Sequence, residues 1–390
     1  MTKDTKRLLG TALREIVDAA RAVERGDTGP KVRIGLLASG SELGPEELLR
    51  GALLAQESSP VQVVMIGPRS AGEGAKELSW IETPDCEEDI SRAMEKALDE
   101  GEIQGCVALH YPFPLGVTTI GKVLTPARGK GMFLASTTGT ASANRVEAML
   151  RNTFYGIATA KASGIADPTV GILNVEGAQT VFKALKKLQE KGYALTFGSS
   201  VRRDGGAILR GNDILAGAVD VCVADSLTGN VLMKMFAAFT TGGGYEATGW
   251  GYGPSCGEGW DRIVSIISRA SGAPVIAGAI ALTARTVRGA LPRLVQEELS
   301  AARKAGLDAI LEDFAVRAQG VAELVVAPPA EPTDEEIHGL DVLSIEEAVR
   351  ELWKAGIYAE SAMGCTGPVV KIPGRHKETA EELLRRGGYC

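Results

Sequence analysis

Features that mark several common protein classes are missing from this chain of 390 residues. Lys and Arg form no cluster and the formal net charge is −7, which argues against a nucleic-acid partner. No apolar run approaches the roughly 20 residues that span a bilayer. The first residues also lack an apolar signal core and a cleavage site. We therefore expect a cytoplasmic protein that contacts neither nucleic acid nor a membrane.

Metal-ligand spacing is absent as well. None of the six cysteines forms a C-x-x-C pair or lies at ligand spacing from a histidine, which disfavours zinc and iron–sulfur sites. The sequence contains no G-K-[ST], so a nucleotide P-loop is excluded. We expect no bound cofactor and no metal, with the cysteines kept as thiols in a reducing compartment.

What the chain does contain is glycine, at 48 residues, and a regular alternation of apolar patterns. Strands are predicted at 32–38, 61–66 and 106–109, with helices at 45–56 and 88–98 between them. A second series follows, with a strand at 170–174, a helix at 179–191 and a strand at 194–198. Strands that alternate with helices are typical of an α/β fold with a parallel, doubly wound sheet.

One stretch, residues 209–234, carries the strongest functional pattern. Ala218–Ala224 predicts a buried strand, Asp225–Asn230 a tight turn, and the residues from Val231 onward a helix. A helix that begins beside the carboxyl end of a parallel strand offers backbone N–H groups to an anion. Lys234 lies about one turn into that helix, where its ammonium would reach back to a phosphate. We therefore predict phosphate binding by Asp225, Thr228, Gly229, Asn230 and Lys234.

Two further segments suit an anion or an acyl carbonyl. Thr138, Gly139 and Thr140 follow a predicted strand and precede a helix, which fits phosphate binding or, equally, a helix cap. Ser268 and Arg269 end another strand-like run. The guanidinium there would bind phosphate through two hydrogen bonds, the alternative being a surface salt bridge.

Three other features have two interpretations each. The glycine-rich residues 242–259 predict a mobile lid or docking loop, or else a crossover between domains. His110 follows the strand at 106–109, where it would either belong to a site at the strand's carboxyl end or, as we expect, be a structural loop histidine. Cys365 lies between small residues in a short turn whose N–H groups would stabilise a thiolate, although most single cysteines are buried structural thiols.

These motifs carry a family resemblance. GNDILAGAVDV and the following D-x-x-T-G-N-V-L-M-K resemble a stretch of the phosphate acyltransferases of phospholipid synthesis, and phosphotransacetylases have a related one. The later segment TTGGGYEATGWGYGPSCGEGWDRIVSIISRASGAPVI and the stretch Met363–Pro368 extend the resemblance to the component C alpha subunits of the glycine/sarcosine/betaine reductase complex. The resemblance covers roughly residues 31–390, although Ala270 replaces the glycine that follows Ser-Arg in phosphotransacetylases.

The resemblance implies a two-lobed fold of the phosphotransacetylase and isocitrate dehydrogenase type. It predicts an N-terminal helix at 1–30, a first lobe from 31–145 plus 262–325, a second lobe at 146–261 and a C-terminal α+β module at 333–390. Neither acyltransferase family carries that module.

The resemblance also implies a reaction, with inorganic phosphate as co-substrate. Component C takes a carboxymethyl group from selenoprotein A, converts it to an acetyl thioester and cleaves the thioester with phosphate to release acetyl phosphate. Cys365 would carry the acetyl group, and the partner would be a ketoacyl synthase-like beta subunit in an oligomer. Two alternatives stay open: a stand-alone phosphate acyltransferase or phosphotransacetylase that uses coenzyme A or acyl carrier protein, and a non-catalytic subunit that supports the partner.

Overall fold

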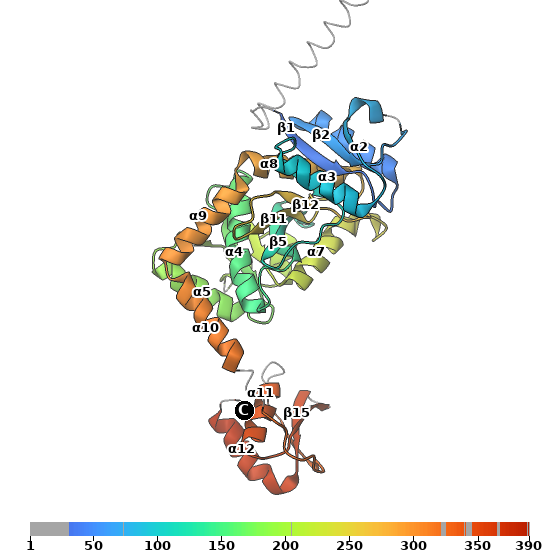
Figure 1. Cartoon of the computed structure of the whole chain (residues 1–390). Helices are drawn as coiled ribbons and strands as arrows, with labels where there is room; N and C mark the ends of the chain where they lie inside the picture. Colours follow the sequence, from blue (N-terminus) through green and yellow to red (C-terminus); the bar gives the residue numbers. More distant parts are fainter. Residues whose placement is uncertain are drawn as a thin grey trace, which may run out of the picture. The chain divides into compact units, whose positions relative to one another are not determined.

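The computed structural model describes residues 31–72, 74–203, 205–320, 325–338, 340, 345–364, 367–387 and 389. The predicted N-terminal helix and Cys365 lie outside the described residues. The chain divides into two compact units, one that reaches Glu312 and one that begins at Asp313 (Figure 1).

The first unit is built on one sheet of twelve strands, in the order β3-β2-β1-β4-β12-β11-β5-β6-β10-β7-β8 with β9 beside β7. The strands are β1 (Val32–Leu37), β2 (Val61–Gly67), β3 (Ser79–Glu82), β4 (Gly105–Ala108), β5 (Val117–Leu124), β6 (Gly131–Gly139), β7 (Thr169–Leu173), β8 (Thr196–Phe197), β9 (Ile208–Leu209), β10 (Val221–Val223), β11 (Gly253–Gly257) and β12 (Val264–Ile266). The central strands are continuous apolar runs buried from both faces, as in a covered parallel sheet, whereas the edge strands β3 and β8 are partly exposed.

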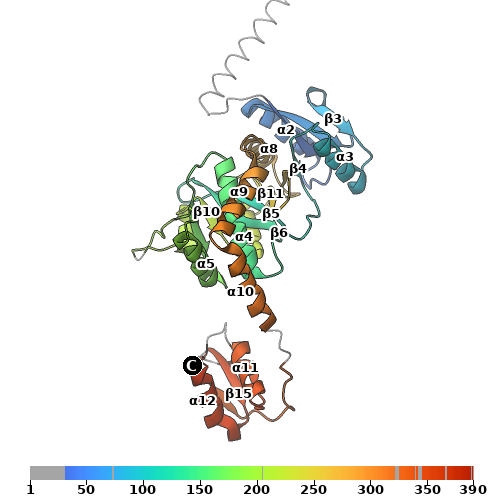
Figure 2. The same ribbon diagram turned by 60° about the vertical axis from the view of Figure 1, so that its left-hand side comes forward.

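Helices cover the sheet. They are α2 (Pro45–Ser58), α3 (Glu87–Asp99), α4 (Arg145–Ala162), α5 (Ala178–Glu190), α6 (Gly211–Ala216), α7 (Ser226–Ala238), α8 (Ala273–Arg288) and α9 (Leu291–Lys304). Helix α10 (Leu307–Gly320) contains the boundary between the two units. Helix α2 contacts α8, α4 lies against β6 and β10, and α9 runs along α4 (Figure 2). The predicted α/β class is therefore confirmed.

The sheet is mixed rather than wholly parallel, which corrects the sequence prediction. Strands β1, β2, β3, β4 and β12 are parallel to one another, but β11 is antiparallel to both β12 and β5, and β5 is antiparallel to β6. Strands β5 and β6 are antiparallel because they form a hairpin around the turn at Thr125, where the Lys130 N–H donates to the Thr125 hydroxyl Oγ1. Beyond β6, strands β10 and β7 are parallel again. Strands from both predicted lobes, whose boundaries we placed near residues 145 and 262, thus belong to one continuous sheet. The division into two lobes stays a prediction.

The glycine-rich segment contains a buried strand, β11, which the sequence prediction of a loop missed. Gly253 has φ +81°, and a Cβ there would lie 1.8 Å from the carbonyl oxygen of Ile120. Only glycine allows the two backbones to approach so closely. Glycine content here therefore marks close strand packing in the second half of residues 242–259 and not a free loop.

The second unit is a small α+β module, as predicted. Strands β13 (Glu335–Ile337), β14 (Glu360–Gly364) and β15 (Gly367–Ile372) form an antiparallel sheet in the order β13-β15-β14. Helices α11 (Ile345–Lys354) and α12 (Lys377–Arg386) supply the other half of its core, in which Leu352, Val370 and Ala380 are fully buried.

Among the described residues, no helix is both long and apolar enough to cross a membrane, and the same residues hold no His, Cys, Asp and Glu group that would bind a metal ion.

Candidate functional site

Helix α7 begins at Ser226, five residues earlier than the sequence predicted. Asp225 is its N-cap: the Thr228 backbone N–H donates to Asp225 Oδ1 at 3.1 Å and the Thr228 hydroxyl donates to Oδ2 at 2.6 Å. Because the side chain satisfies the free N–H groups, the helix forms directly at the strand's end and the predicted turn at Asp225–Asn230 is wrong. Burial acts to raise the pKa of Asp225, but hydrogen bonds from Thr228 and Arg145 outweigh it and lower that pKa.

Gly229 lets α7 lie directly on β6. A Cβ at this position would be 1.7 Å from the backbone carbonyl oxygen of Ser136, which no side chain tolerates. One residue on, Asn230 Nδ2 donates to the Thr137 carbonyl at 2.9 Å and fixes the helix to the strand. This contact sets the positions of Asn230 and Lys234 relative to the end of β6.

A cavity of about 300 Å³ lies beside this contact. It gathers five of the predicted residues, namely Thr138, Asn230, Lys234, Ser268 and Arg269. The residues that the sequence did not assign to it are Glu42, Leu109, His110, Tyr111, Phe113, Tyr252, Ile266 and Ile267. We call this space the Lys234–Arg269 cavity.

No carboxylate of the described residues is in direct contact with either cation of the Lys234–Arg269 cavity, although the charge of the buried Glu246 acts on Lys234 from a greater distance. Both side chains are exposed, and neither forms an ion pair within the part of the chain that the structure describes. The Lys234 ammonium instead lies 5.7 Å from the centre of the Tyr252 ring. Two unpaired cations that line one cavity, with Glu42 the one carboxylate among its described lining residues, favour an anionic ligand.

A buried carboxylate, Glu246, supports both cationic segments. It is 3% exposed, and it accepts hydrogen bonds from the Tyr252 hydroxyl and from Ser271 Oγ, each at 3.0 Å. Ser271 Oγ in turn accepts from the backbone N–H of Ser268, next to Arg269. Burial raises the pKa of Glu246, although its hydrogen bonds from Ser271 and Tyr252 act in the opposite direction. Glu246 thus connects the ring under Lys234 to the turn that carries Arg269.

Three predicted residues line a different cavity, of about 340 Å³. Gly139, Thr140 and Asp225 lie there with Arg145, whose guanidinium is paired to Glu176 at 2.7 Å and to Asp225 at 3.2 Å. Since its cation is already neutralised, this second cavity has no unpaired charge for phosphate. Thr228 and Gly229 line neither cavity.

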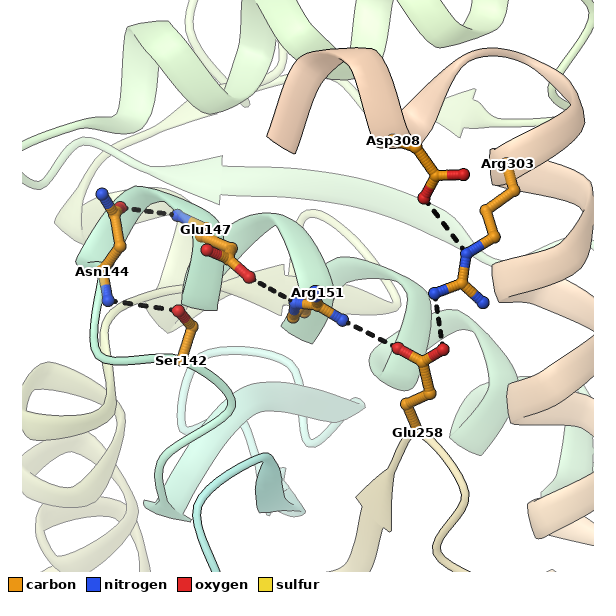
Figure 3. A network of polar contacts seen from close by, with 7 residues as sticks. All are labelled: Ser142, Asn144, Glu147, Arg151, Glu258, Arg303 and Asp308. Atoms are coloured by element: carbon orange, nitrogen blue, oxygen red, sulfur yellow. Dashed lines mark hydrogen bonds and ion pairs between the residues drawn. The ribbon is translucent and has the colours of Figure 1, made fainter. Parts of the chain in front are cut away.

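The Thr138–Thr140 segment is the end of strand β6 and its first following residue, so the alternative of a helix cap is wrong here. The cap of α4 is Asn144, whose Oδ1 accepts the Glu147 N–H at 3.0 Å (Figure 3). Beyond the cap, Glu147 pairs with Arg151, and Glu258 bridges Arg151 to Arg303. This chain of ion pairs joins α4, the end of β11 and α9 away from the Lys234–Arg269 cavity.

His110, which we expected to be a structural loop histidine, lines the Lys234–Arg269 cavity at the carboxyl end of its strand. A signal for it exists: the strands that precede His110 and Arg269 are parallel neighbours, with Ala108 opposite Ile266. Side chains that follow two such strands come together at one edge of the sheet. This inference needs the order of the strands in the sheet, which a single sequence does not reveal.

The described cysteines of the sheet are poor nucleophiles. Cys106, Cys222 and Cys256 are buried, and burial raises the pKa of each thiol, to about 12 for Cys222 and Cys256. A thiol so protonated does not attack a carbonyl at neutral pH.

Comparisons with known proteins agree with the motifs. The family model described as "Fatty acid synthesis protein" matches residues 32–371. The chain is 47% identical over 388 residues to the glycine/sarcosine/betaine reductase complex component C subunit alpha of Peptoclostridium acidaminophilum, which covers 99% of each chain. It is 31% identical over 232 residues to the phosphate acyltransferase of Thermotoga maritima, 52% of this chain and 68% of that protein. A branched-chain phosphotransacylase structure from Enterococcus faecalis V583 aligns with a TM-score of 0.48 and 15% identity, over 66% of this chain and 99% of that one.

Proposed function

Because the chain belongs to the family of component C alpha subunits of the glycine/sarcosine/betaine reductase complex, which is related to phosphate acyltransferases, we propose that it cleaves an enzyme-bound acetyl thioester with inorganic phosphate and releases acetyl phosphate. The observation that carries this proposal is the pair of cations, Lys234 and Arg269, that line one cavity without a direct ion-pair partner among the described residues.

Phosphate binds in the Lys234–Arg269 cavity in this proposal. The Arg269 guanidinium presents parallel N–H donors that match two phosphate oxygens, and the Lys234 ammonium adds a point charge. A phosphate oxygen attacks the thioester carbonyl, and the thiolate leaves. The hydroxyls of Thr138 and Ser268, two residues that line the same cavity, donate to the oxygen that becomes negative during the attack. Fixed positions for both reactants lower the entropic part of the barrier.

The acetyl group is carried by Cys365 in this proposal. The three buried cysteines of the sheet are protonated thiols, and Cys86 is the exposed cysteine of the described residues. Cys365 differs from Cys86 in its sequence context, a short segment with glycine on both sides of the Cys-Thr pair, where little hinders access to the sulfur.

The proposed partners follow from the family. The thioester would be made with a ketoacyl synthase-like beta subunit of component C, from a carboxymethyl group that selenoprotein A delivers. The protein would act in the cytoplasm as part of an oligomer, with inorganic phosphate as co-substrate and no bound cofactor or metal.

A second candidate is a stand-alone phosphate acyltransferase or phosphotransacetylase. The relatives named phosphate acyltransferase, which align with 52% of this chain, favour it. In that case coenzyme A or acyl carrier protein holds the acyl group, and Cys365 is dispensable.

Covalent loading distinguishes the two candidates. Acetyl phosphate is added to the wild type, to Cys365→Ala and to the control Cys86→Ala, and acetylation is read by intact mass and peptide mapping. The proposal expects one acetyl group on Cys365, removed by arsenate, in the wild type and in the control. Exchange between acetyl phosphate and labelled phosphate that persists in Cys365→Ala and requires coenzyme A would instead establish the second candidate.

A further inference from the structure

His110 and Glu87 form a hydrogen-bonded pair at the edge of the Lys234–Arg269 cavity. His110 Nδ1 lies 2.6 Å from Glu87 Oε1. Glu87 is the first residue of α3, whereas His110 follows β4, so two separate elements hold the pair together. Since a carboxylate only accepts hydrogen bonds, a neutral His110 carries its proton on Nδ1 and its free lone pair on Nε2. Nε2 makes no hydrogen bond within the described residues.

The pair lies next to the phosphate-binding turn. Strands β4 and β12 are parallel with Ala108 opposite Ile266, and the Ile267 N–H donates to the Ala108 carbonyl at 2.9 Å. Continued by two residues, this register brings His110 beside the Ser268–Arg269 turn, at the usual spacing of neighbouring strands, about 4.8 Å. A smaller cavity of about 90 Å³, lined by Glu87, His110 and Arg269 among others, adjoins at the same residues.

We propose that His110, oriented by Glu87, is the acid–base group of the acyl transfer in the Lys234–Arg269 cavity. This role rests on the proposed function. Hydrogen phosphate dianion and the acetyl thioester give acetyl phosphate dianion and a free thiol. One C–O bond forms and one C–S bond breaks, and the sulfur keeps the electron pair. The phosphate hydroxyl proton passes to His110 Nε2 during the attack and from there to the departing sulfur, so no proton is gained or lost.

The competing explanation is an ordinary surface ion pair, because the two side chains are 57% and 68% exposed. The chain contains a matched pair for comparison. His338 lies 3.6 Å from Glu336 in the second unit, with similar exposure of 56% and 40%. A surface pair of this kind has no effect on a chemical step, whereas removal of a general acid–base group slows it by about 10²- to 10⁴-fold.

The test is the exchange of labelled phosphate into acetyl phosphate, catalysed by this chain together with the subunits that co-purify with it. His110→Gln is expected to lower kcat by at least about 10²-fold while KM for phosphate changes less than about threefold. Imidazole added to His110→Ala is expected to raise the exchange rate of this variant at least about tenfold, because the small molecule replaces the missing base. Glu87→Gln, which no longer fixes the tautomer, should lose about tenfold in kcat, and His338→Gln should match the wild type.

Each result decides the role. The role of His110 is overturned if the exchange rate of His110→Gln lies within twofold of the wild-type rate, as the rate of the control His338→Gln should. A rise in KM with unchanged kcat assigns His110 to binding and also overturns it, as does a loss in His110→Ala that imidazole leaves unaltered. No exchange in the wild type overturns the proposed function itself, and the role of His110 with it, so the two failures are distinct.

Discussion

Substitution of one glycine should damage both stability and phosphate binding. In Gly229→Ala the new Cβ would lie 1.7 Å from the Ser136 carbonyl oxygen, whereas ordinary van der Waals contact begins near 3.4 Å. The obstacle is strand backbone in the centre of the sheet and not the end of a flexible side chain, so helix α7 has to move away from β6 by more than about 1 Å.

The magnitude follows from two opposing terms. Overpacking of a close contact costs about 1–3 kcal/mol, and the cost here is at the upper end because backbone is displaced. The better helix propensity of alanine returns at most about 1 kcal/mol. We therefore expect a net loss of about 2 kcal/mol in the free energy of unfolding, seen as a lower midpoint in urea. Displacement of Asn230 and Lys234 should also raise KM for phosphate.

Gly211→Ala is the matched control, because a Cβ at Gly211, at the start of α6, meets no atom within 4 Å. It should be at least as stable as the wild type and should bind phosphate equally well. If Gly229→Ala is as stable as Gly211→Ala and its KM for phosphate is unchanged, then the close contact between α7 and β6 is not what positions the site.

Two further carboxylates, one buried and one bridging, give testable expectations. Glu246→Gln leaves one acceptor oxygen for two hydroxyl donors, so KM for phosphate should rise about 3- to 10-fold. The control, Glu298→Gln, removes a similar buried carboxylate held by Tyr193 and Lys161, and it should lower stability without a change in KM. Equal effects of the two variants on KM would contradict the positioning role of Glu246. Burial acts to raise the pKa of Glu258, but Arg303 and Arg151 outweigh it and lower that pKa. A carboxyl whose pKa is lowered in the folded state stabilises the fold fully above its unfolded pKa of about 4.3, and this stabilisation is lost as the pH falls through the folded pKa. Glu258→Gln should therefore unfold at lower urea than the wild type at neutral pH, and a difference that does not shrink below about pH 4 would count against the pairing.

The sequence was informative where local chemistry decides the structure. The strand and helix of the central stretch follow from apolar periodicity, and both are present as β10 and α7. The start of α7 was misplaced because Asp225 was interpreted as part of a turn. An Asp directly before a helix is also a preferred N-cap, and Asp225 accepts the backbone N–H of Thr228 in this way. The glycines of β11 were interpreted as a loop because the sequence does not show which strand lies beside them. The close approach of the Ile120 backbone on β5 is what requires glycine at Gly253.

The composition of the site depended on long-range pairing. Lys234 and Arg269 were both predicted, but the sequence does not say that they line one cavity while Gly139 and Asp225 line another. His110 is hydrogen-bonded to Glu87 and Glu246 to Ser271, partners that lie 23 and 25 residues away in the sequence. Such groups become visible only when the strand order is known.

In the proposed reaction, Lys234 and Arg269 bind the phosphate that accepts the acyl group. The most direct measurement is the phosphate dependence of the exchange between acetyl phosphate and labelled phosphate in Lys234→Met, in Arg269→Met and in a control, Lys186→Met, which removes an exposed helix lysine outside the cavity. Loss of a charge-assisted hydrogen bond costs about 1.5–3 kcal/mol, so KM for phosphate should rise about 10- to 150-fold in the first two variants and stay unchanged in the control. Wild-type KM values in Lys234→Met and Arg269→Met would contradict the account.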